Sequence, residues 1–123
     1  MILLEGINDI GSGVVTSAGQ LIAADTRLIA QAHAAGLRIL GGTLTPFQGT
    51  GYYSPAKERI REQVNAWIRD SGAFDGVVDF DRAVRDPVDP LRIAPAYDSG
   101  DHIHPDDAGY QAMADAVGLA LLR

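Results

Sequence analysis

The sequence contains no cysteine. This absence excludes a disulfide scaffold, a thiolate zinc site and a cysteine nucleophile, so any chemistry must come from Ser, His, Asp, Glu or Asn. No segment approaches the ~18 consecutive apolar residues of a membrane span. The first residues also lack the basic region, apolar core and cleavage site of a secretory signal. We therefore expect no membrane span and no targeting signal within this sequence.

Basic side chains are few: 10 Lys and Arg stand against 16 Asp and Glu, which gives a net charge of −6. A phosphate backbone or an anionic membrane surface would be repelled, so neither a nucleic acid nor a lipid surface is an expected partner. The chain has 123 residues, of which 46% are hydrophobic. This length suits one domain spanning residues 1–123 and leaves no room for two.

Apolar segments of strand and helix type alternate along the chain. Strands are predicted over Met1–Glu5, Leu37–Gly42 and Phe74–Asp79, the first of them buried on both faces. Helices are predicted over 17–35, from Ser54 and Pro55 to about Ser71, and from Pro105 to Leu121, with mostly loop over 80–104. This order predicts an α/β fold with a parallel sheet covered by helices, whose ligands bind at the carboxyl ends of the strands.

Two polar clusters fall at that edge of the sheet. Asn8 follows the first strand, where its amide could donate to a ligand oxygen. Asp101 precedes His104 by three residues at the start of the last helix. A carboxylate so placed can accept from one imidazole nitrogen and leave the other free to take a proton, and the helix N-terminus disfavours the charged imidazolium. Each cluster alone is also typical of an ordinary turn.

Together the clusters resemble a known family. Gly6-Ile7-Asn8-Asp9 is similar to the third conserved block of the SGNH, or GDSL, hydrolases, and Asp101, Ile103, His104 and Pro105 with Gly109-Tyr110 resemble the fifth. The resemblance covers essentially the whole chain. It implies a three-layer α/β/α fold of flavodoxin-like type and carboxylic-ester hydrolysis without a metal or cofactor. It also implies that His104 is the base, Asp101 its orienting acid and Asn8 the oxyanion donor.

The Gly-Asp-Ser block that carries the family's nucleophilic serine has no counterpart here, and neither has the block with the second oxyanion donor. The chain thus resembles the C-terminal part of the family fold, as a fragment, a mis-started reading frame or a short form. Ser12, four residues after Asn8, is the first candidate for a substitute nucleophile, followed by Ser99. Water activated by His104 is a third route.

The sequence leaves three functional hypotheses open. The first is an esterase acting on small-molecule, carbohydrate or lipid esters, and the second is a weak or inactive binding or assembly module derived from one. The third is a metal site at His102 and His104 with Asp98 and Asp101, although His102 is more simply a variable residue between acid and base. The edge of the first strand would face water, which predicts a homodimer through that edge.

Other polar and aromatic residues have structural interpretations. Phe47, Tyr52 and Tyr53 follow the second strand and either contact a substrate or pack within their loop. Asp79 and Asp81 are expected to pair with Arg82 or Arg85. The four charged residues Glu58, Arg59, Arg61 and Glu62 are expected on a solvated helix face, and His33 on the surface.

Overall fold

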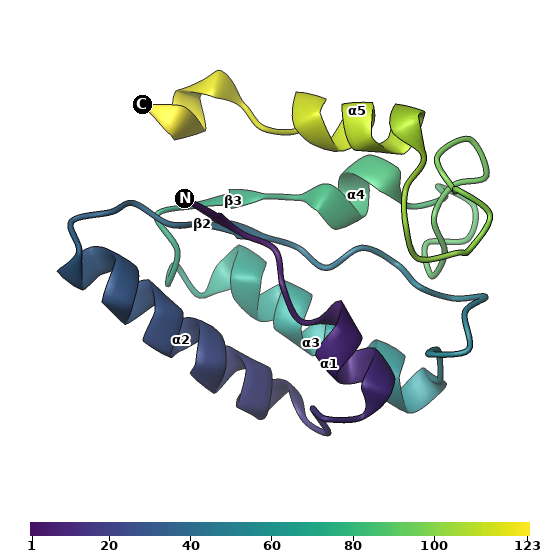
Figure 1. Ribbon diagram of the computed structural model, residues 1–123, viewed down its shortest axis with the longest axis horizontal. Helices are drawn as coiled ribbons and strands as arrows, with labels where there is room; N and C mark the ends of the chain where they lie inside the picture. Colours follow the sequence, from purple (N-terminus) through teal and green to yellow (C-terminus); the bar gives the residue numbers. More distant parts are fainter.

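Three short parallel strands form the centre of the computed structural model, which describes residues 1–123. The elements follow one another as β1 (Ile2–Leu3), α1 (Ile7–Ser12), α2 (Ala18–Ala34), β2 (Leu40–Gly42), α3 (Pro55–Asp70), β3 (Gly76–Val78), α4 (Phe80–Val84), α5 (Asp107–Asp115) and a 3-10 helix, η1 (Leu119–Leu122). Figure 1 shows α2 and α3 on one side of the sheet and α5 on the other. The predicted α/β fold, with its parallel sheet between helical layers, is confirmed.

The central strand β2 pairs with β1 on one side and with β3 on the other. Its two glycines let aromatic rings lie directly on the sheet. A Cβ atom on Gly41 would come within 2.6 Å of Phe74, and one on Gly42 within 2.8 Å of Phe80. Because successive residues of a strand face opposite sides, these rings belong to the two separate hydrophobic clusters on the two faces.

Serine caps begin the two long helices where the sequence predicts them. The Ser54 hydroxyl accepts a hydrogen bond from the Lys57 amide at 3.2 Å, and the Gln20 side chain accepts from the Ser17 amide at 3.2 Å. These bonds satisfy donors that the first helical turn leaves free. Both helices match their predicted bounds closely. Neither they nor the shorter helices are long and apolar enough to cross a membrane.

The first strand differs from its prediction. It is two residues long, and Met1 and Ile2 are 59% and 39% exposed. The prediction of burial on both faces is therefore wrong, whereas the predicted position of this strand at an open edge of the sheet is confirmed, since β1 pairs only with β2.

Two short helices were not predicted, and the last helix is shorter than expected. The turn predicted after the first strand is the start of α1, and α4 lies in the segment predicted to be loop. The Asp79 side chain caps α4 by accepting from the Arg82 amide at 3.1 Å. The last helix ends at Asp115 because the chain becomes extended at Gly118 before forming η1.

The expectation of a solvated charged face on α3 is wrong for two of its residues. Glu58 and Arg61 are each 4% exposed. The Arg61 guanidinium binds the Glu58 carboxylate at 2.5 Å, the Asp81 carboxylate at 2.9 Å and the Leu44 carbonyl at 2.8 Å. The residues after β2 and at the start of α4 cover this side of α3. The sequence periodicity of a helix cannot predict that distant segments will cover its charged side.

The two aspartates after β3 form more ion pairs than predicted. Asp81 binds Arg85 at 3.2 Å as expected, but it also binds Arg61 and, at 2.7 Å, Arg69. The main partner of Asp79 is Arg69 at 2.7 Å, while Arg82 lies at 4.0 Å. Burial alone would raise the pKa of Asp79, but hydrogen bonds from Arg69, the Arg82 amide and the Thr43 hydroxyl outweigh burial and lower it to about 2.

Candidate active site

The loop that precedes α5 positions His104. The loop is closed at its base, where the Ser99 amide donates to the His104 carbonyl at 3.1 Å and the Asp106 amide donates to the Tyr97 carbonyl at 2.7 Å. The Asp106 side chain then caps α5 by accepting from the Gly109 amide at 2.8 Å. The imidazole is thus carried on a segment whose two ends are fixed by hydrogen bonds.

Asp101 orients the His104 ring. One carboxylate oxygen of Asp101 accepts from the backbone amides of His104 and Ile103 at 2.8 and 3.0 Å. The other lies 2.6 Å from Nδ1 of His104. These hydrogen bonds hold the pKa of Asp101 well below its usual range. The largest contribution comes from the His104 amide, followed by the His104 ring and the Ile103 amide. An ionised carboxylate at Nδ1 favours the tautomer whose Nε2 can accept a proton.

The His104 ring is open to incoming groups. Its side chain is 66% exposed, and Nε2 has no hydrogen-bond partner in the protein. A group that binds beside the ring can therefore exchange a proton with it without displacing a protein contact.

Gly6 and Ile10 position Asn8 at the start of α1. Gly6 has a φ of +125°, and a Cβ atom there would lie 2.4 Å from the Leu21 side chain, so the turn from β1 into α1 requires glycine. Ile10 is fully buried in the core and anchors α1. Asn8 is exposed, and its amide makes no hydrogen bond within the protein. Its donors therefore remain available to a ligand.

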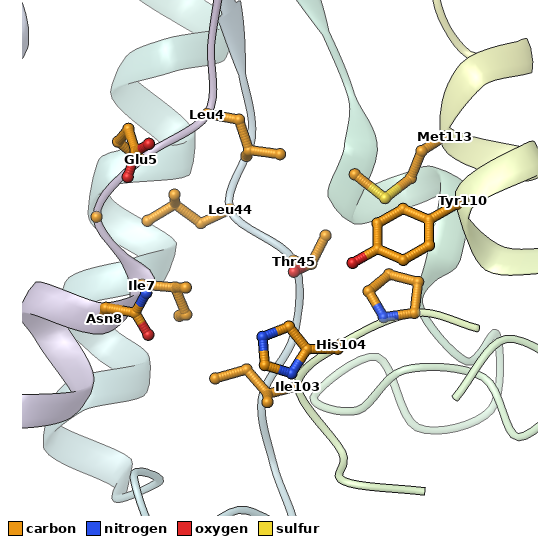
Figure 2. A pocket seen from close by; sticks show the side chains of 12 residues that line it. Leu4, Glu5, Ile7, Asn8, Leu44, Thr45, Ile103, His104, Tyr110 and Met113 are labelled. Atoms are coloured by element: carbon orange, nitrogen blue, oxygen red, sulfur yellow. The ribbon is translucent and has the colours of Figure 1, made fainter. Parts of the chain in front are cut away.

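Asn8 and His104 line the same hollow, although nearly the whole chain separates them in sequence (Figure 2). The hollow has a volume of about 200 Å³, and half of its lining residues are hydrophobic. Its other lining residues come from the end of β1, the start of α1, the segment after β2, and α5: Leu4, Glu5, Gly6, Ile7, Leu44, Thr45, Ile103, Pro105, Tyr110 and Met113. The carboxyl edge of the sheet, which the sequence indicated as the binding edge, thus brings the two clusters together.

A second hollow, of about 440 Å³, meets the first at Asn8, Ile103 and His104. Its wall is the loop of residues 49–52, and Asp101 completes its lining. Most of its lining residues are polar or glycine, and we refer to it as the polar hollow. A molecule that lies against His104 can therefore extend into either hollow.

No serine side chain lines either hollow. Ser12 is the last residue of α1, and its hydroxyl donates to the Asp9 carbonyl at 3.4 Å. Ser99 lies at the base of the loop before α5 and lines neither hollow. The structure therefore brings together His104, Asp101 and Asn8 but does not place Ser12 with them.

Threonine and tyrosine hydroxyls line the hollows instead. The Thr50 hydroxyl is engaged with the Phe47 carbonyl at 2.9 Å, whereas the Thr45 hydroxyl makes no hydrogen bond within the protein and lies close to the His104 ring in Figure 2. Sequence reasoning missed Thr45. The signal that could have identified it is its position just after β2, at the carboxyl edge of the sheet.

The aromatic residues of the loop after β2 divide between packing and exposure. Phe47 is completely buried, and its ring packs edge to face against Tyr53 with 5.3 Å between centroids. Tyr52 is exposed and lines the polar hollow. Of the two interpretations left open by the sequence, packing holds for Phe47 and Tyr53, while Tyr52 remains available for contact with a ligand.

The second histidine of the loop belongs to a separate pair. Nδ1 of His102 lies 2.5 Å from the Asp98 carboxylate, whereas His104 binds Asp101. No three His, Asp or Glu side chains are grouped as a metal site would require. His102 is also the only non-glycine residue with a positive φ, +66°, a conformation that costs roughly 1 kcal/mol or more.

Comparisons with known proteins identify a family and a fold for the chain. Residues 1–112 match the model of the GDSL-like lipase/acylhydrolase family. Among solved structures, the chain is similar to a GDSL-like lipase from Bacteroides thetaiotaomicron, with a TM-score of 0.78 and 17% identity over 98% of this chain and 60% of that one. No curated protein sequence matches the chain.

Two further structures show the same fold. A Bacteroides fragilis protein described as an acylhydrolase has a TM-score of 0.81 and 19% identity over 98% of this chain and 60% of that one. A Streptococcus pneumonia protein described as a platelet activating factor has a TM-score of 0.75 and 21% identity over 98% and 58% of the two chains. The present chain spans 58–60% of the length of these structures.

Proposed function

Because the chain belongs to the GDSL-like lipase/acylhydrolase family, we propose that it takes part in the hydrolysis of carboxylic esters through His104, Asp101 and Asn8. The observation that carries this proposal is the contact of 2.6 Å between Nδ1 of His104 and Oδ2 of Asp101. The His104 ring lines a hollow that Asn8 also lines. A base with one fixed and one free nitrogen, beside a free amide donor, suits acyl transfer.

Each group has a distinct role in the proposed reaction. Nε2 of His104 takes the proton of the attacking hydroxyl as that oxygen bonds to the ester carbonyl carbon. Asn8 donates to the carbonyl oxygen, which becomes negatively charged. When the carbon–oxygen bond to the alcohol breaks, His104 returns the proton to the leaving oxygen. Asp101 stays ionised and stabilises the imidazolium that forms between the two transfers.

The source of the attacking hydroxyl limits the expected rate. Since no serine lines the hollows, attack within this chain would come from Ser12 after a local rearrangement or from water activated by His104. Both routes lack a second oxyanion donor from the family's missing block, and one such donor is worth about 3 kcal/mol. We therefore expect slow turnover, on esters of small molecules, carbohydrates or lipids.

The test is hydrolysis of a short p-nitrophenyl ester by the wild type, by His104→Ala and by His33→Ala. His33 is a matched control because it also pairs with an aspartate, Asp75 at 3.0 Å, but lines neither hollow. We expect His104→Ala to lose about 10²-fold or more of the rate and His33→Ala to retain it. Equal rates in all three proteins would reject His104 as the base.

Ser12→Ala distinguishes the two sources of the nucleophile. If Ser12 attacks, the wild type forms a covalent adduct with an organophosphate and the variant does not. If water attacks, neither protein is labelled, and both hydrolyse the ester at the same slow rate.

The second candidate is a binding or assembly module that has kept the cleft without turnover. The observation that favours it is the same lack of a serine beside His104. Such a module would bind an ester in the hollows, detected by calorimetry or by NMR shifts, and leave it intact. Detectable hydrolysis that depends on His104 would exclude this candidate.

We also propose that two copies associate through β1. This strand pairs on one side only, and its neighbours Met1 and Leu4 are exposed, so a second β1 could extend the sheet and cover apolar surface. Light scattering coupled to size exclusion at micromolar concentration should give the dimer mass, and Ile2→Lys should shift it toward the monomer. A monomeric wild type would disprove the proposal.

A further inference from the structure

The second imidazole–carboxylate pair, His102 with Asp98, touches the wall of the polar hollow but lies outside the proposed chemistry. Asp98 uses one oxygen to accept from the amides of Gly100 and His102 at 2.9 and 3.0 Å and the other to bind the His102 ring at 2.5 Å. Burial opposes ionisation, but these hydrogen bonds still lower the pKa of Asp98. The loop therefore contains two successive aspartate-capped turns, and each orients one histidine.

The His102 ring is seated against Gly49. A Cβ atom added to Gly49 would lie 3.0–3.2 Å from Cγ, Cδ2 and Cβ of His102. Gly49 also has a φ of +103°, which side-chain-bearing residues rarely adopt. Two independent features of Gly49, its backbone conformation and its lack of a side chain, therefore allow this close contact between the loop before α5 and the loop after β2.

The contact joins the two loops that form the polar hollow. Gly49 begins the wall of residues 49–52, while His104 and Asp101 form the opposite side. The same wall segment is tied elsewhere to the chain, since the Gln48 amide donates to the Leu91 carbonyl at 3.0 Å. His102 contacts this wall at Gly49 and lies two residues from His104 along the chain, so its ring links the wall to the loop that carries the proposed base.

The backbone at His102 supports a role beyond simple loop closure. A left-handed φ of +66° is accommodated more easily by glycine or asparagine. Strained residues cluster at functional sites, so this strained histidine at the rim of a cleft points to a contribution of the imidazole itself. Its side chain is 52% exposed, so a contribution to the hydrophobic core does not explain the strain.

We propose that His102 is a positioning residue: its ring, held by Asp98 and seated on Gly49, fixes the wall of residues 49–52 relative to His104. This inference rests on the proposed function for its consequence in catalysis, but the position of the wall can be measured without activity. His102→Asn tests it, because asparagine tolerates the left-handed backbone. The substitution keeps the hydrogen bond from the backbone amide of residue 102 to Asp98 and removes the ring. His33→Asn is the matched control, since it also removes an imidazole from an aspartate.

The experiment combines steady-state kinetics on a series of p-nitrophenyl esters with amide NMR spectra of the ester-free proteins. For His102→Asn we expect KM to rise about threefold or more while kcat stays within about twofold, and we expect the amide signals of residues 49–52 to shift or broaden. His33→Asn should change neither. A purely structural role would lower Tm, leave KM of the folded protein unchanged and confine any shift to the Gly49 amide that the lost ring touches, which would overturn the proposal.

The NMR measurement separates this inference from the proposed function. If the wild type hydrolyses no ester, the proposed function fails, yet shifted signals in residues 49–52 would still support positioning of the wall by His102. If hydrolysis depends on His104 but the His102→Asn spectra match those of the wild type over residues 49–52, the positioning proposal fails and the proposed function stands.

Discussion

Two regions of the molecule pair carboxylates with basic side chains, and they differ in exposure. Around Arg61, the Glu58 and Asp81 carboxylates are buried, and the guanidinium binds both of them and the Leu44 carbonyl. Around His104, the ring and Asp101 are open, and Nε2 has no partner in the protein. A basic group therefore stabilises the fold where each of its nitrogens is bonded within the protein, and it is available for chemistry where one nitrogen is left free.

The two clusters also differ in the segments that they join. The Arg61 cluster joins α3, the segment after β2 and the start of α4, so it fixes the loop segment that contains Leu44 and Thr45 beneath the hollow. The His104 cluster lies at the end of a loop that hydrogen bonds close at its base. A buried cluster and an exposed pair thus support the same cleft from two sides.

The largest expected effect comes from breaking the buried cluster. Arg61→Met leaves two buried carboxylates, Glu58 and Asp81, without their shared cation, and should destabilise the fold by about 3–5 kcal/mol. Urea unfolding measures this loss. Arg59→Met, on the exposed side of the same helix, is the control and should change stability little. A small loss in Arg61→Met would mean that the cluster is solvated rather than buried.

Replacing Asp101, the acid of the exposed pair, should lower activity and leave stability nearly unchanged. In Asp101→Asn the amide would favour the wrong tautomer of His104, so the ester hydrolysis rate should fall at least about 10²-fold while the urea midpoint stays nearly constant. Because hydrogen bonds hold the pKa of Asp101 well below its usual range, Asp101 should stay ionised and add no step of its own to the wild-type pH–rate profile near neutral pH. Asp75→Asn, at the distant histidine pair, is the control for the rate. A retained rate in Asp101→Asn would contradict the orienting role.

Asp25 is a third kind of carboxylate in this molecule, because it is buried but has neither the ion pairs of the Arg61 cluster nor the histidine partner of Asp101. Asp25 lies in the buried stripe of α2 between Leu21 and Ile29, is 4% exposed and forms no hydrogen bond or ion pair. Burial raises the pKa of Asp25 to about 6. The folded state therefore binds a proton more tightly than the unfolded state, and stability should rise as pH falls from about 6 toward 4.

Asp25→Asn tests this pH dependence. Above pH 7 the substitution removes a buried charge and should stabilise the fold by about 1–2 kcal/mol, whereas near pH 4, where Asp25 is protonated, the gain should disappear. Thermal or urea unfolding at both pH values measures the difference. Glu62→Gln, an exposed carboxylate on α3, should show no such dependence. A gain that is equal at both pH values would disprove burial as the cause.

Much of the fold could be predicted from local pattern. Ser17 and Ser54 marked the starts of α2 and α3, and the apolar runs marked the positions of the strands, because caps and periodicity act over a few residues. The prediction failed where distant segments decide. The burial of Arg61 depends on α4 and on the segment after β2, and the exposure of β1 depends on which strands pair with it.

The candidate site shows the same division. The sequence identified Asn8, Asp101 and His104, because the Asp101–His104 pair is local and the Asn8 turn follows a strand. It left open whether Tyr52 contacts a ligand, and it did not identify Thr45 or the contact of His102 with Gly49, since these contacts join loops that lie far apart in the chain. Ser12 was near Asn8 in sequence, but the direction of α1 places it outside both hollows.

The sequence by itself determined the order of the three strands and the three main helices, the caps of the two long helices and the aspartate-held imidazole, because apolar periodicity and hydrogen bonds between residues a few positions apart depend only on the local chain. The tertiary structure alone decided that Asn8 shares a cleft with His104, that Arg61 is buried and that no serine lines that cleft. These outcomes depend on the parallel pairing of strands and on the packing of loops over helices, which bring together residues that no local pattern relates.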